Sequence, residues 1–502
     1  MTSETASASP LAPSSAEAAD KAAPAATPRA LQLSFAMLML MLVLAALDQT
    51  IVATALPSIA RDLQGAARMS WVFSAYLIAA TVVVPLYGKL ADMHGTKPVL
   101  LVAIAVFLTG SALCGLSRQM DELILARAVQ GAGGGGLLTL AMMAVVWAFP
   151  PQSRGRLQGL LGASYGLSTM AGPLVGGFLV EHLSWRWAFF INLPAGLLAL
   201  GVLALKFPRL KPLHRGTMDY LGAALLCGAL VSLLLSTRHP EVPTSVSAGA
   251  ASSAWSATRL ALLGLGLCGL FVWVQARTRS PLLPLSLFAQ RSFSAVSALS
   301  ACTGFTLFAV VVFMPQYFQT ARGLSPAESG WHLMPLMAGI TLASVGSGRI
   351  LSATGRVRSV AIAACVLAAL AFVALGFSVR DAGASLAATS AWLVPLGMGI
   401  GALFPLVTVV AQSAVPMPLM GIATSSPVMF RSVAGAVGVS LLSTVFEHAV
   451  ASELALHVAG ATRQSVFGMA LSQVLGWAAA VSVVAACVAW GLPARLARPA
   501  GR

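Results

Sequence analysis

Long apolar segments separated by short polar loops fill most of the chain. A helix needs roughly 20 apolar residues to cross a bilayer core of about 30 Å, whereas a spanning strand shows alternating segments of about ten residues. The sequence therefore predicts an all-α membrane protein. Of its 502 residues 58% are hydrophobic and only 9% are charged, far from the balance of soluble domains. We place fourteen spans at 34–57, 70–88, 98–117, 122–148, 157–180, 187–207, 219–236, 259–276, 292–318, 330–350, 358–378, 386–412, 424–450 and 469–492.

The net charge of +15 raises the question of a nucleic-acid partner. The basic residues stand singly or in small groups between apolar segments, without the basic stripe that such a partner needs, so we expect no nucleic acid. With an even number of spans, the side that holds both chain ends carries nineteen of the 30 Lys and Arg residues, against nine on the other side. Because cytoplasmic loops are enriched in Lys and Arg, we expect a multi-pass protein of the inner (cytoplasmic) membrane with both termini in the cytoplasm.

The ends of the chain and its Cys and His residues suggest no further chemistry. Residues 1–30 are rich in Ala, Ser and Pro, so we expect a disordered cytoplasmic tail rather than a cleaved leader. A second short tail follows at 493–502. The six Cys residues have no paired spacing and the seven His residues form no ligand pair, so we expect neither a metal nor a cofactor.

Two similar loops indicate an internal duplication. GKLADMHGTK (Gly88–Lys97) follows the second span and GRILSATGRVR (Gly348–Arg358) follows the tenth, and both carry glycines seven residues apart. If the seventh and eighth spans are an insertion, the two loops occupy the same place in a six-helix unit. Paired six-helix halves are a transporter arrangement, with the substrate site near the membrane midplane. We therefore predict pseudo-symmetric six-helix bundles at 31–207 and 291–492, with two inserted helices and their linkers at 208–290.

A single carboxylate, Asp48, interrupts the apolar stretch LDQTIVATALP (Leu47–Pro57). At 1.5 Å per residue it lies about 20 Å along the first span, near mid-depth. An ionised carboxylate there costs about 2.5–3.5 kcal/mol, and removal from water favours the neutral form. Asp48 is therefore predicted to take up and release protons. The alternative is a permanently protonated side chain that joins two helices by a hydrogen bond.

The fourth span carries an arginine at a comparable depth, within LILARAVQGAGGGG (Leu123–Gly136). A buried guanidinium needs acceptors, and Asp48 is the expected partner of Arg127, directly or through water. The alternative is that Arg127 reaches outward to lipid headgroups. Four consecutive glycines weaken a helix by about 1 kcal/mol each relative to alanine, so we expect them to serve close helix approach or local bending.

The fifth span carries a second group of small residues, in GLLGASYGLSTMAGPLVGGFL. Gly172, Gly176 and Gly177 give a face on which backbones can meet. Pro173 removes one helical hydrogen bond and bends the helix. Ordinary helix packing explains this group equally well.

These motifs resemble the major facilitator superfamily and, within it, the fourteen-helix drug:proton antiporters of the EmrB/QacA type. The resemblance covers about residues 34–490. It departs from the usual pattern at Ala53, Thr54, Thr96 and Ser168. The motifs that carry it are, in chain order, LDQTIVATALP, GKLADMHGTK, LARAVQGAGGG, GLLGASYGLSTMAGPLVGG, WRWAFFINLPAG (Trp185–Gly196) and FRSVAGAVG (Phe430–Gly438).

The resemblance implies proton-driven export of drugs, antibiotics or similar amphipathic small molecules by alternating access, without enzymatic activity. Asp48 would carry the proton and Arg127 would tune it, while the glycines of the fifth span would prevent leak. The loop after the second span would form a cytoplasmic latch between the halves, with its carboxylate facing a helix N-terminus; positive-inside topology alone is the alternative. The latch residues would be Gly88, Asp92, Gly95 and Lys97.

The substrate cavity implied by the resemblance is apolar and aromatic. A candidate set, which ordinary packing explains as well, is Trp71, Tyr76, Gln130, Phe308 and Phe404. The alternative function is proton-coupled transport of one physiological metabolite, although the glycines of the fifth span favour export. A receptor or membrane enzyme would be expected to carry a soluble domain or a motif such as HExxH, and neither is found. The sequence contains no readable helical arm for an outer-membrane adaptor.

Overall fold

A computed structural model of the protein describes residues 28–65, 68–208, 217–236, 249–278, 280–381, 383–456 and 463–496. This part of the chain is helical, with one isolated bridge between Arg356 and Arg495. The elements are α2 (Pro28–Asp62), α3 (Met69–His94), α4 (Thr96–Leu116), α5 (Met120–Ala148), α6 (Pro151–His182), α7 (Trp187–Phe190), α8 (Asn192–Lys206), α9 (Tyr220–Ser236), α10 (Gly249–Arg277), η2 (Leu285–Ala289), α11 (Arg291–Gln316), η3 (Tyr317–Ala321), α12 (Pro326–Thr354), α13 (Arg358–Arg380), α14 (Leu386–Ala391), α15 (Leu393–Ser413), η4 (Met417–Leu419), α16 (Met420–Leu456) and α17 (Arg463–Ala489).

Twelve helices in the described residues are long and apolar enough to cross a membrane. The predicted count of fourteen spans is therefore not confirmed. Two of the predicted spans fall outside the twelve for different reasons. The helix α9 is apolar but only 17 residues long, and α6 has 32 residues whose apolar character is diluted by glycine, serine and glutamine.

Two predicted boundaries also differ from the structure. The helix α10 begins at Gly249, ten residues before the predicted span, so part of the linker between the two predicted spans 219–236 and 259–276 is helical. The tail predicted at 493–502 begins with backbone hydrogen bonds to the loop after α12, from Val357 N to Ala494 O at 3.2 Å and from Leu496 N to Gly355 O at 2.9 Å. Most of the N-terminal tail, residues 1–27, lies outside the described residues, as do 497–502.

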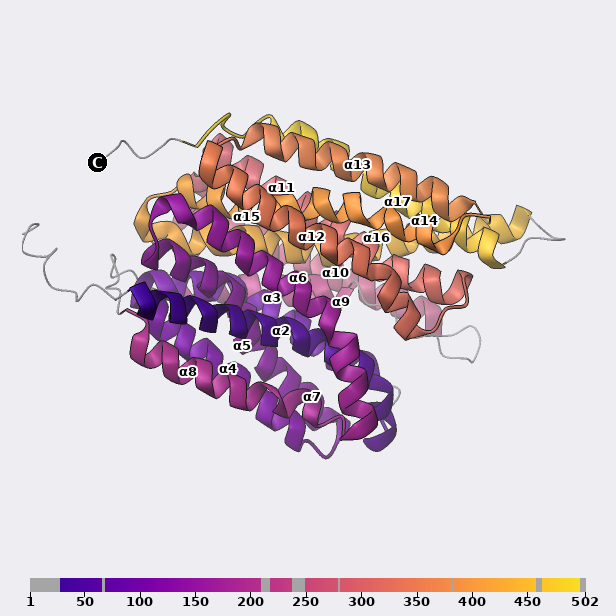
Figure 1. The fold of residues 1–502 in the computed structure, drawn as a ribbon, viewed down its shortest axis with the longest axis horizontal. Coiled ribbons are helices and arrows are strands. Elements are labelled where there is room, and N and C mark those ends of the chain that lie inside the picture. The colour runs from indigo at the N-terminus through magenta and orange to yellow at the C-terminus, as the bar shows by residue number, and fades with distance from the viewer. Residues whose placement is uncertain are drawn as a thin grey trace, which may run out of the picture.

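The hydrophobic core is divided between two groups of helices (Figure 1). One group, α2–α8, packs around Ile104 and Phe107; we call it the N-terminal bundle. The other, α11–α17, packs around Phe313, Phe372 and Leu471, and is the C-terminal bundle. Figure 1 shows the two lying side by side, the N-terminal bundle in indigo to magenta below and the C-terminal bundle in salmon to yellow above.

The two repeated loops occupy equivalent places in these bundles. Gly95 separates α3 from α4 and Gly355 ends α12 just before α13. Both have positive φ angles, 88° and 65°, a region that glycine adopts without the strain a side chain would add. The seven-residue glycine spacing seen in the sequence therefore corresponds to a glycine with positive φ at the chain reversal in each bundle.

The helix pair α9–α10 contacts both bundles. One apolar cluster contains Leu226 of α9, Phe271 of α10, Val84 of α3 and Ile422 of α16. Asp219 begins the pair, since its carboxylate accepts hydrogen bonds from Gly222 N at 2.8 Å and from Gln275 Nε2 of α10 at 2.6 Å. Helices α9 and α10 thus form a pair lying across the line between the bundles.

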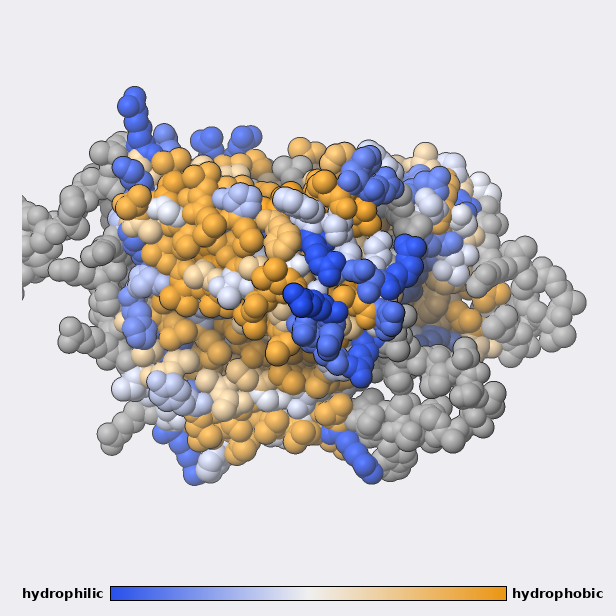
Figure 2. All heavy atoms as spheres, turned by 90° about the horizontal axis from the view of Figure 1, so that it is seen from below, coloured by the Kyte–Doolittle hydropathy of each residue, from blue (hydrophilic) through white to orange (hydrophobic). Residues whose placement is uncertain are grey.

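The outer surface suits a hydrocarbon environment. Figure 2 shows broad hydrophobic areas, with hydrophilic side chains gathered mainly towards the helix ends. Large apolar side chains remain more than half exposed, including Leu125, Leu205, Leu370 and Trp477. In water a continuous apolar surface of this kind would be unfavourable, whereas lipid tails accommodate it.

Candidate functional site

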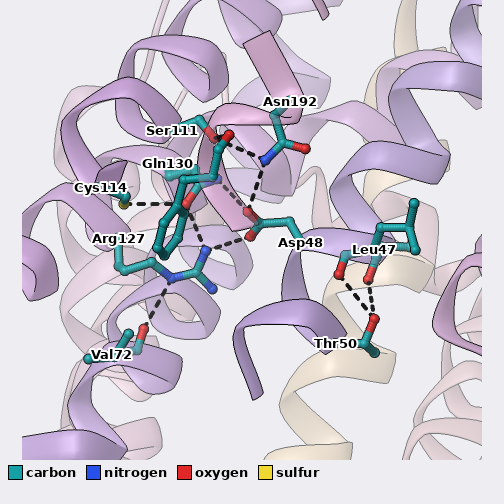
Figure 3. Close-up of polar contacts among 11 residues, drawn as sticks. Leu47, Asp48, Thr50, Val72, Ser111, Cys114, Arg127, Gln130 and Asn192 are labelled. Carbon is teal, nitrogen blue, oxygen red and sulfur yellow. Dashed lines mark hydrogen bonds and ion pairs between the residues drawn. The ribbon is translucent and has the colours of Figure 1, made fainter. Parts of the chain in front are cut away.

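Asp48 of α2 is fully buried, and its carboxylate accepts three hydrogen bonds (Figure 3). Oδ2 accepts from Arg127 Nη1 at 2.5 Å. Oδ1 accepts from Gln130 Nε2 at 2.7 Å and from Asn192 Nδ2 at 3.1 Å. A guanidinium and two amide NH2 groups all donate, so both carboxylate oxygens act as acceptors in this arrangement.

The Arg127 side chain is also fully buried, which does not fit the alternative that it reaches lipid headgroups. Besides Asp48, it donates from Nη1 to Gln130 Oε1 at 2.7 Å and from Nε to Val72 O at 3.3 Å. Its guanidinium lies 4.3 Å from the ring centroid of Tyr76, within the range of a cation–π contact. Its Nη2 has no hydrogen-bond partner within the described part of the chain.

Two further polar residues, Ser111 and Asn192, complete this network and were not predicted. Ser111 Oγ accepts from Gln130 Nε2 at 3.1 Å and from Asn192 Nδ2 at 2.9 Å, and donates to Phe189 O at 2.9 Å. Ser111 lies in the apolar helix α4, and Asn192 begins α8 immediately after the break at Ile191. Asn192 stands in the quoted motif WRWAFFINLPAG, but nothing in its spacing indicates that it faces Asp48.

The glycines of α5 explain how Arg127 and Gln130 come so close to the other helices. A Cβ at Gly131 or Gly135 would overlap the backbone of α3, and a Cβ at Gly133 would overlap the backbone of α4 at Phe107. Helix α5 therefore packs backbone to backbone against both neighbours. The close approach expected from the glycine run is present here.

Asp92 lies in α3 of the N-terminal bundle, and its carboxylate contacts the start of α16 in the C-terminal bundle. It accepts hydrogen bonds from Gly421 N at 2.7 Å and from Ile422 N at 3.3 Å. The first N–H groups of a helix lack intrahelical acceptors and carry the positive end of the helix dipole, so a carboxylate is stabilising there. The helices cross closely, because a Cβ at Gly88 would lie 2.6 Å from the carbonyl oxygen of Gly421.

A second crossing repeats this geometry between α12 and α6. Ser352 follows Gly348 by four residues, as Asp92 follows Gly88, and its Oγ accepts from Arg156 N at 3.1 Å. A Cβ at Gly155 would lie 2.8 Å from Gly348 O. The repeat therefore keeps the glycine contact and the acceptor but replaces the carboxylate by a hydroxyl.

Between these crossings, a buried amide pair also joins the bundles. Gln158 Nε2 donates to Gln412 Oε1 at 2.7 Å, and Gln412 Nε2 donates to Thr424 Oγ1 at 3.0 Å. We call the two crossings and this amide pair the inter-bundle seam. It lies at the end of the molecule where α2 begins and the C-terminus is found, on the left of Figure 1.

The other two predicted latch residues make contacts within or beside the N-terminal bundle. Lys97 Nζ donates to the carbonyl of Phe207, which ends α8. Gly95 provides the chain reversal before α4. The neighbouring Lys89, which was not predicted, donates to Pro281 O at 3.1 Å in the segment after α10.

The small residues of α6 differ in their surroundings. A Cβ at Gly172 would overlap the Thr50 side chain on α2, two residues after Asp48, while the Cβ position of Gly177 has nothing within 4 Å. Gly176 is buried. Pro173 lies inside the helix, and its side chain is outside the described part of the structure.

Of the five candidate cavity residues, Tyr76 and Gln130 lie together, and the cavity itself stays a prediction. Tyr76 and Gln130 are buried in the Asp48 network. Phe308 packs against Gly435 in the C-terminal bundle, and the ring of Phe404 lies 4.8 Å from the Arg431 guanidinium carbon. Trp71, at the start of α3, is 40% exposed.

Residues 38–439 match the family profile described as Major Facilitator Superfamily. The chain therefore belongs to this superfamily, whose members are membrane transporters and not enzymes.

Similar proteins include transporters with and without an assigned activity. An uncharacterized MFS-type transporter of Mycobacterium tuberculosis is 35% identical over 443 residues, which are 88% of this chain and 63% of that protein. The chain thus spans less than two thirds of that relative's length. The multidrug transporter protein MdtP of Bacillus subtilis is 33% identical over 403 residues, 80% of this chain and 72% of that protein.

Solved structures share the fold at low sequence identity. The human organic anion transporter MFSD10 aligns with a TM-score of 0.63 at 15% identity, over 91% of this chain and 99% of that one. A double Trp mutant of XylE aligns with a TM-score of 0.66 at 14% identity, over 93% and 97%. Both similarities concern the fold alone.

Proposed function

We propose that this protein is a proton-coupled exporter of amphipathic small molecules, such as drugs or antibiotics, with fourteen spans and both termini in the cytoplasm. The proposal includes α6 and α9 among the spans. The observation that supports it best is the buried Asp48–Arg127 pair, with a donor–acceptor distance of 2.5 Å. The relatives from Bacillus subtilis named as a multidrug transporter and a multidrug resistance protein support the substrate class.

Proton coupling follows from the energetics of this pair. Protonation of Asp48 removes the negative charge and leaves the Arg127 guanidinium buried without a counter-charge. Breaking a buried ion pair in this way costs about 3–5 kcal/mol. Since about 1.4 kcal/mol changes an equilibrium tenfold, proton binding disfavours the present packing of α2 against α5 by at least a hundredfold. Protonation therefore drives the transporter towards a conformation in which Arg127 is hydrated or differently paired.

In an alternating-access cycle, protonation of Asp48 would be linked to opening and closing of the two ends of the transporter. With the termini in the cytoplasm, the inter-bundle seam closes the cytoplasmic end, so the state with ionised Asp48 faces outward. A proton from outside neutralises Asp48, the seam opens, and the proton leaves towards the cytoplasm while substrate enters. An inward-moving charge gains about 2.3 kcal/mol per 100 mV of membrane potential. The Asp92 contact with α16 stabilises the closed seam in this cycle.

Asp48→Asn tests the proposal. A susceptibility screen of an efflux-deficient host first identifies an exported compound, and proteoliposomes with an imposed pH gradient then report its movement and that of protons. We expect Asp48→Asn to remain inserted but to lose proton-coupled transport. Glu181→Gln, which removes an exposed acid near the end of α6, is the matched control. Unchanged coupling in Asp48→Asn would exclude Asp48 as the proton carrier, and movement of both species in one direction would indicate symport.

A further inference from the structure

Asn192 occupies a special position in the Asp48 network. It is 1% exposed, and its Nδ2 donates both to Asp48 Oδ1 at 3.1 Å and to Ser111 Oγ at 2.9 Å. The segment before it is anchored at the far end of α2, where Trp185 Nε1 and Arg186 Nη1 donate to Asp62 Oδ2 at 2.8 and 2.9 Å. The break at Ile191 then starts α8 with this side chain beside the carboxylate.

The three donors to Asp48 differ in what they can do once the carboxylate gains a proton. A protonated Asp48 carries an O–H that needs an acceptor. Arg127 has no acceptor atom. Gln130 directs its Oε1 to Arg127 Nη1 at 2.7 Å and to Cys114 Sγ at 3.5 Å, so turning its amide would set an NH2 group against the guanidinium.

The amide of Asn192 is under no such constraint. Figure 3 shows its oxygen pointing away from Asp48, with the nitrogen towards the carboxylate. A half-turn about the last side-chain bond exchanges these two atoms, which are nearly equal in size. The oxygen then faces both Asp48 and Ser111, and the Ser111 hydroxyl can turn from Phe189 O to donate to it.

We propose that Asn192 is the positioning residue that adapts the cluster to proton gain, donating to ionised Asp48 and, after an amide half-turn, accepting from protonated Asp48. The step forms one O–H bond on Asp48 Oδ1 and breaks one O–H bond of a hydronium ion, which leaves as water, and nothing else is transferred. The inference rests on the proposed proton coupling. Among the side chains that the structure describes, the titratable or charged groups around the Asp48–Arg127 pair are the Cys114 thiol from α4 and the Tyr76 phenol from α3, which lies beside Arg127.

Infrared difference spectroscopy of the purified full chain, between neutral and acidic pH, tests this inference without a substrate. A protonated-carboxyl C=O band that Asp48→Asn removes reports Asp48. An asparagine amide C=O signal, identified by 13C-asparagine labelling, should titrate with the same midpoint. It should vanish in Asp48→Asn and in Asn192→Leu. Absence of the amide signal, or its persistence in Asn192→Leu, would overturn the proposal.

A second variant keeps the test informative if Asn192→Leu does not fold. Asn192→Asp is nearly isosteric and sets a second carboxyl against Asp48. Because like charges disfavour ionisation, the midpoint of the Asp48 band should rise by one pH unit or more, a tenfold gain in proton affinity. An unchanged midpoint contradicts the proposed contact. Thr139→Val, which removes a buried hydroxyl that lacks a partner within the described residues, should leave both signals unchanged. If Asp48 itself gives no titrating band, proton coupling through Asp48 fails as a whole.

Discussion

Replacing Gly88 by alanine should shift the equilibrium between the closed and open states of the inter-bundle seam. The new Cβ would lie 2.6 Å from Gly421 O, whereas ordinary contacts begin at 3.4 Å. The difference, 3.4 − 2.6, requires α3 and α16 to separate by about 0.8 Å. The bond from Gly421 N to Asp92, now 2.7 Å, would then approach 3.5 Å, where a hydrogen bond is largely lost.

The energetic cost follows from these two effects. Overpacking costs about 1–3 kcal/mol, and a hydrogen bond to a charged group contributes about 1.5–3 kcal/mol. Even the lower values together exceed the roughly 1.4 kcal/mol that changes an equilibrium tenfold. We therefore expect Gly88→Ala to increase the population of the open seam at least tenfold.

Distance measurements between spin labels at positions 94 and 413 can detect this shift. Both residues are exposed, and they end α3 and α15 beside the seam. The labels require a background without the six native Cys residues. Gly201→Ala on α8 is the matched control, since nothing lies within 4 Å of its Cβ position. A Gly88→Ala distance distribution identical to that of Gly201→Ala would refute the reasoning.

Two further predictions concern α2 and its neighbours. Gly172→Ala places a methyl group against Thr50, so we expect lower thermal stability and impaired transport in proteoliposomes, whereas Gly177→Ala should behave as wild type; equal behaviour of the two would contradict the packing described. Hydrogen bonds from Trp185 and Arg186 lower the pKa of Asp62 below its ordinary value of 3.8. Its contribution to stability is therefore present above about pH 4 and is lost as the pH falls through the lower folded value. Melting temperatures of wild type and Asp62→Asn should differ at pH 6 and converge in acid, and a constant difference would show that Asp62 is not responsible.

The sequence predicted how deep a residue lies in the membrane, but it said much less about which face of its helix the residue occupies. Counting residues from the helix ends put Asp48 and Arg127 at similar depths, and the structure joins them. The same count cannot tell which side of a helix faces its neighbours. Ser111 and Asn192 were therefore missed, because a single polar residue in an apolar helix has no periodic signal.

The candidate substrate cavity stays a prediction for the same reason. The sequence does not give the rotation of a helix about its axis. In the structure Tyr76 lies against Arg127 in the Asp48 network, and the ring of Phe404 lies against Arg431. The span count depended on composition: the glycines that let α6 pack against α2 and α12 also lower the apolar character by which a span is recognised. Close packing and hydrophobicity make opposite demands on such a helix.

Because the helix pair α9–α10 contacts both bundles, any movement of one bundle relative to the other would make the pair slide along at least one of them. Its apolar cluster contacts Val84 of the N-terminal bundle and Ile422 of the C-terminal bundle. When the two bundles move apart, the pair cannot keep both contacts unchanged. Apolar contacts have no fixed direction and tolerate small sliding steps, while the bond between Asp219 and Gln275 keeps the two helices together as they slide. In the proposed transport cycle, the packing along this strip would therefore limit how far the bundles can move relative to one another.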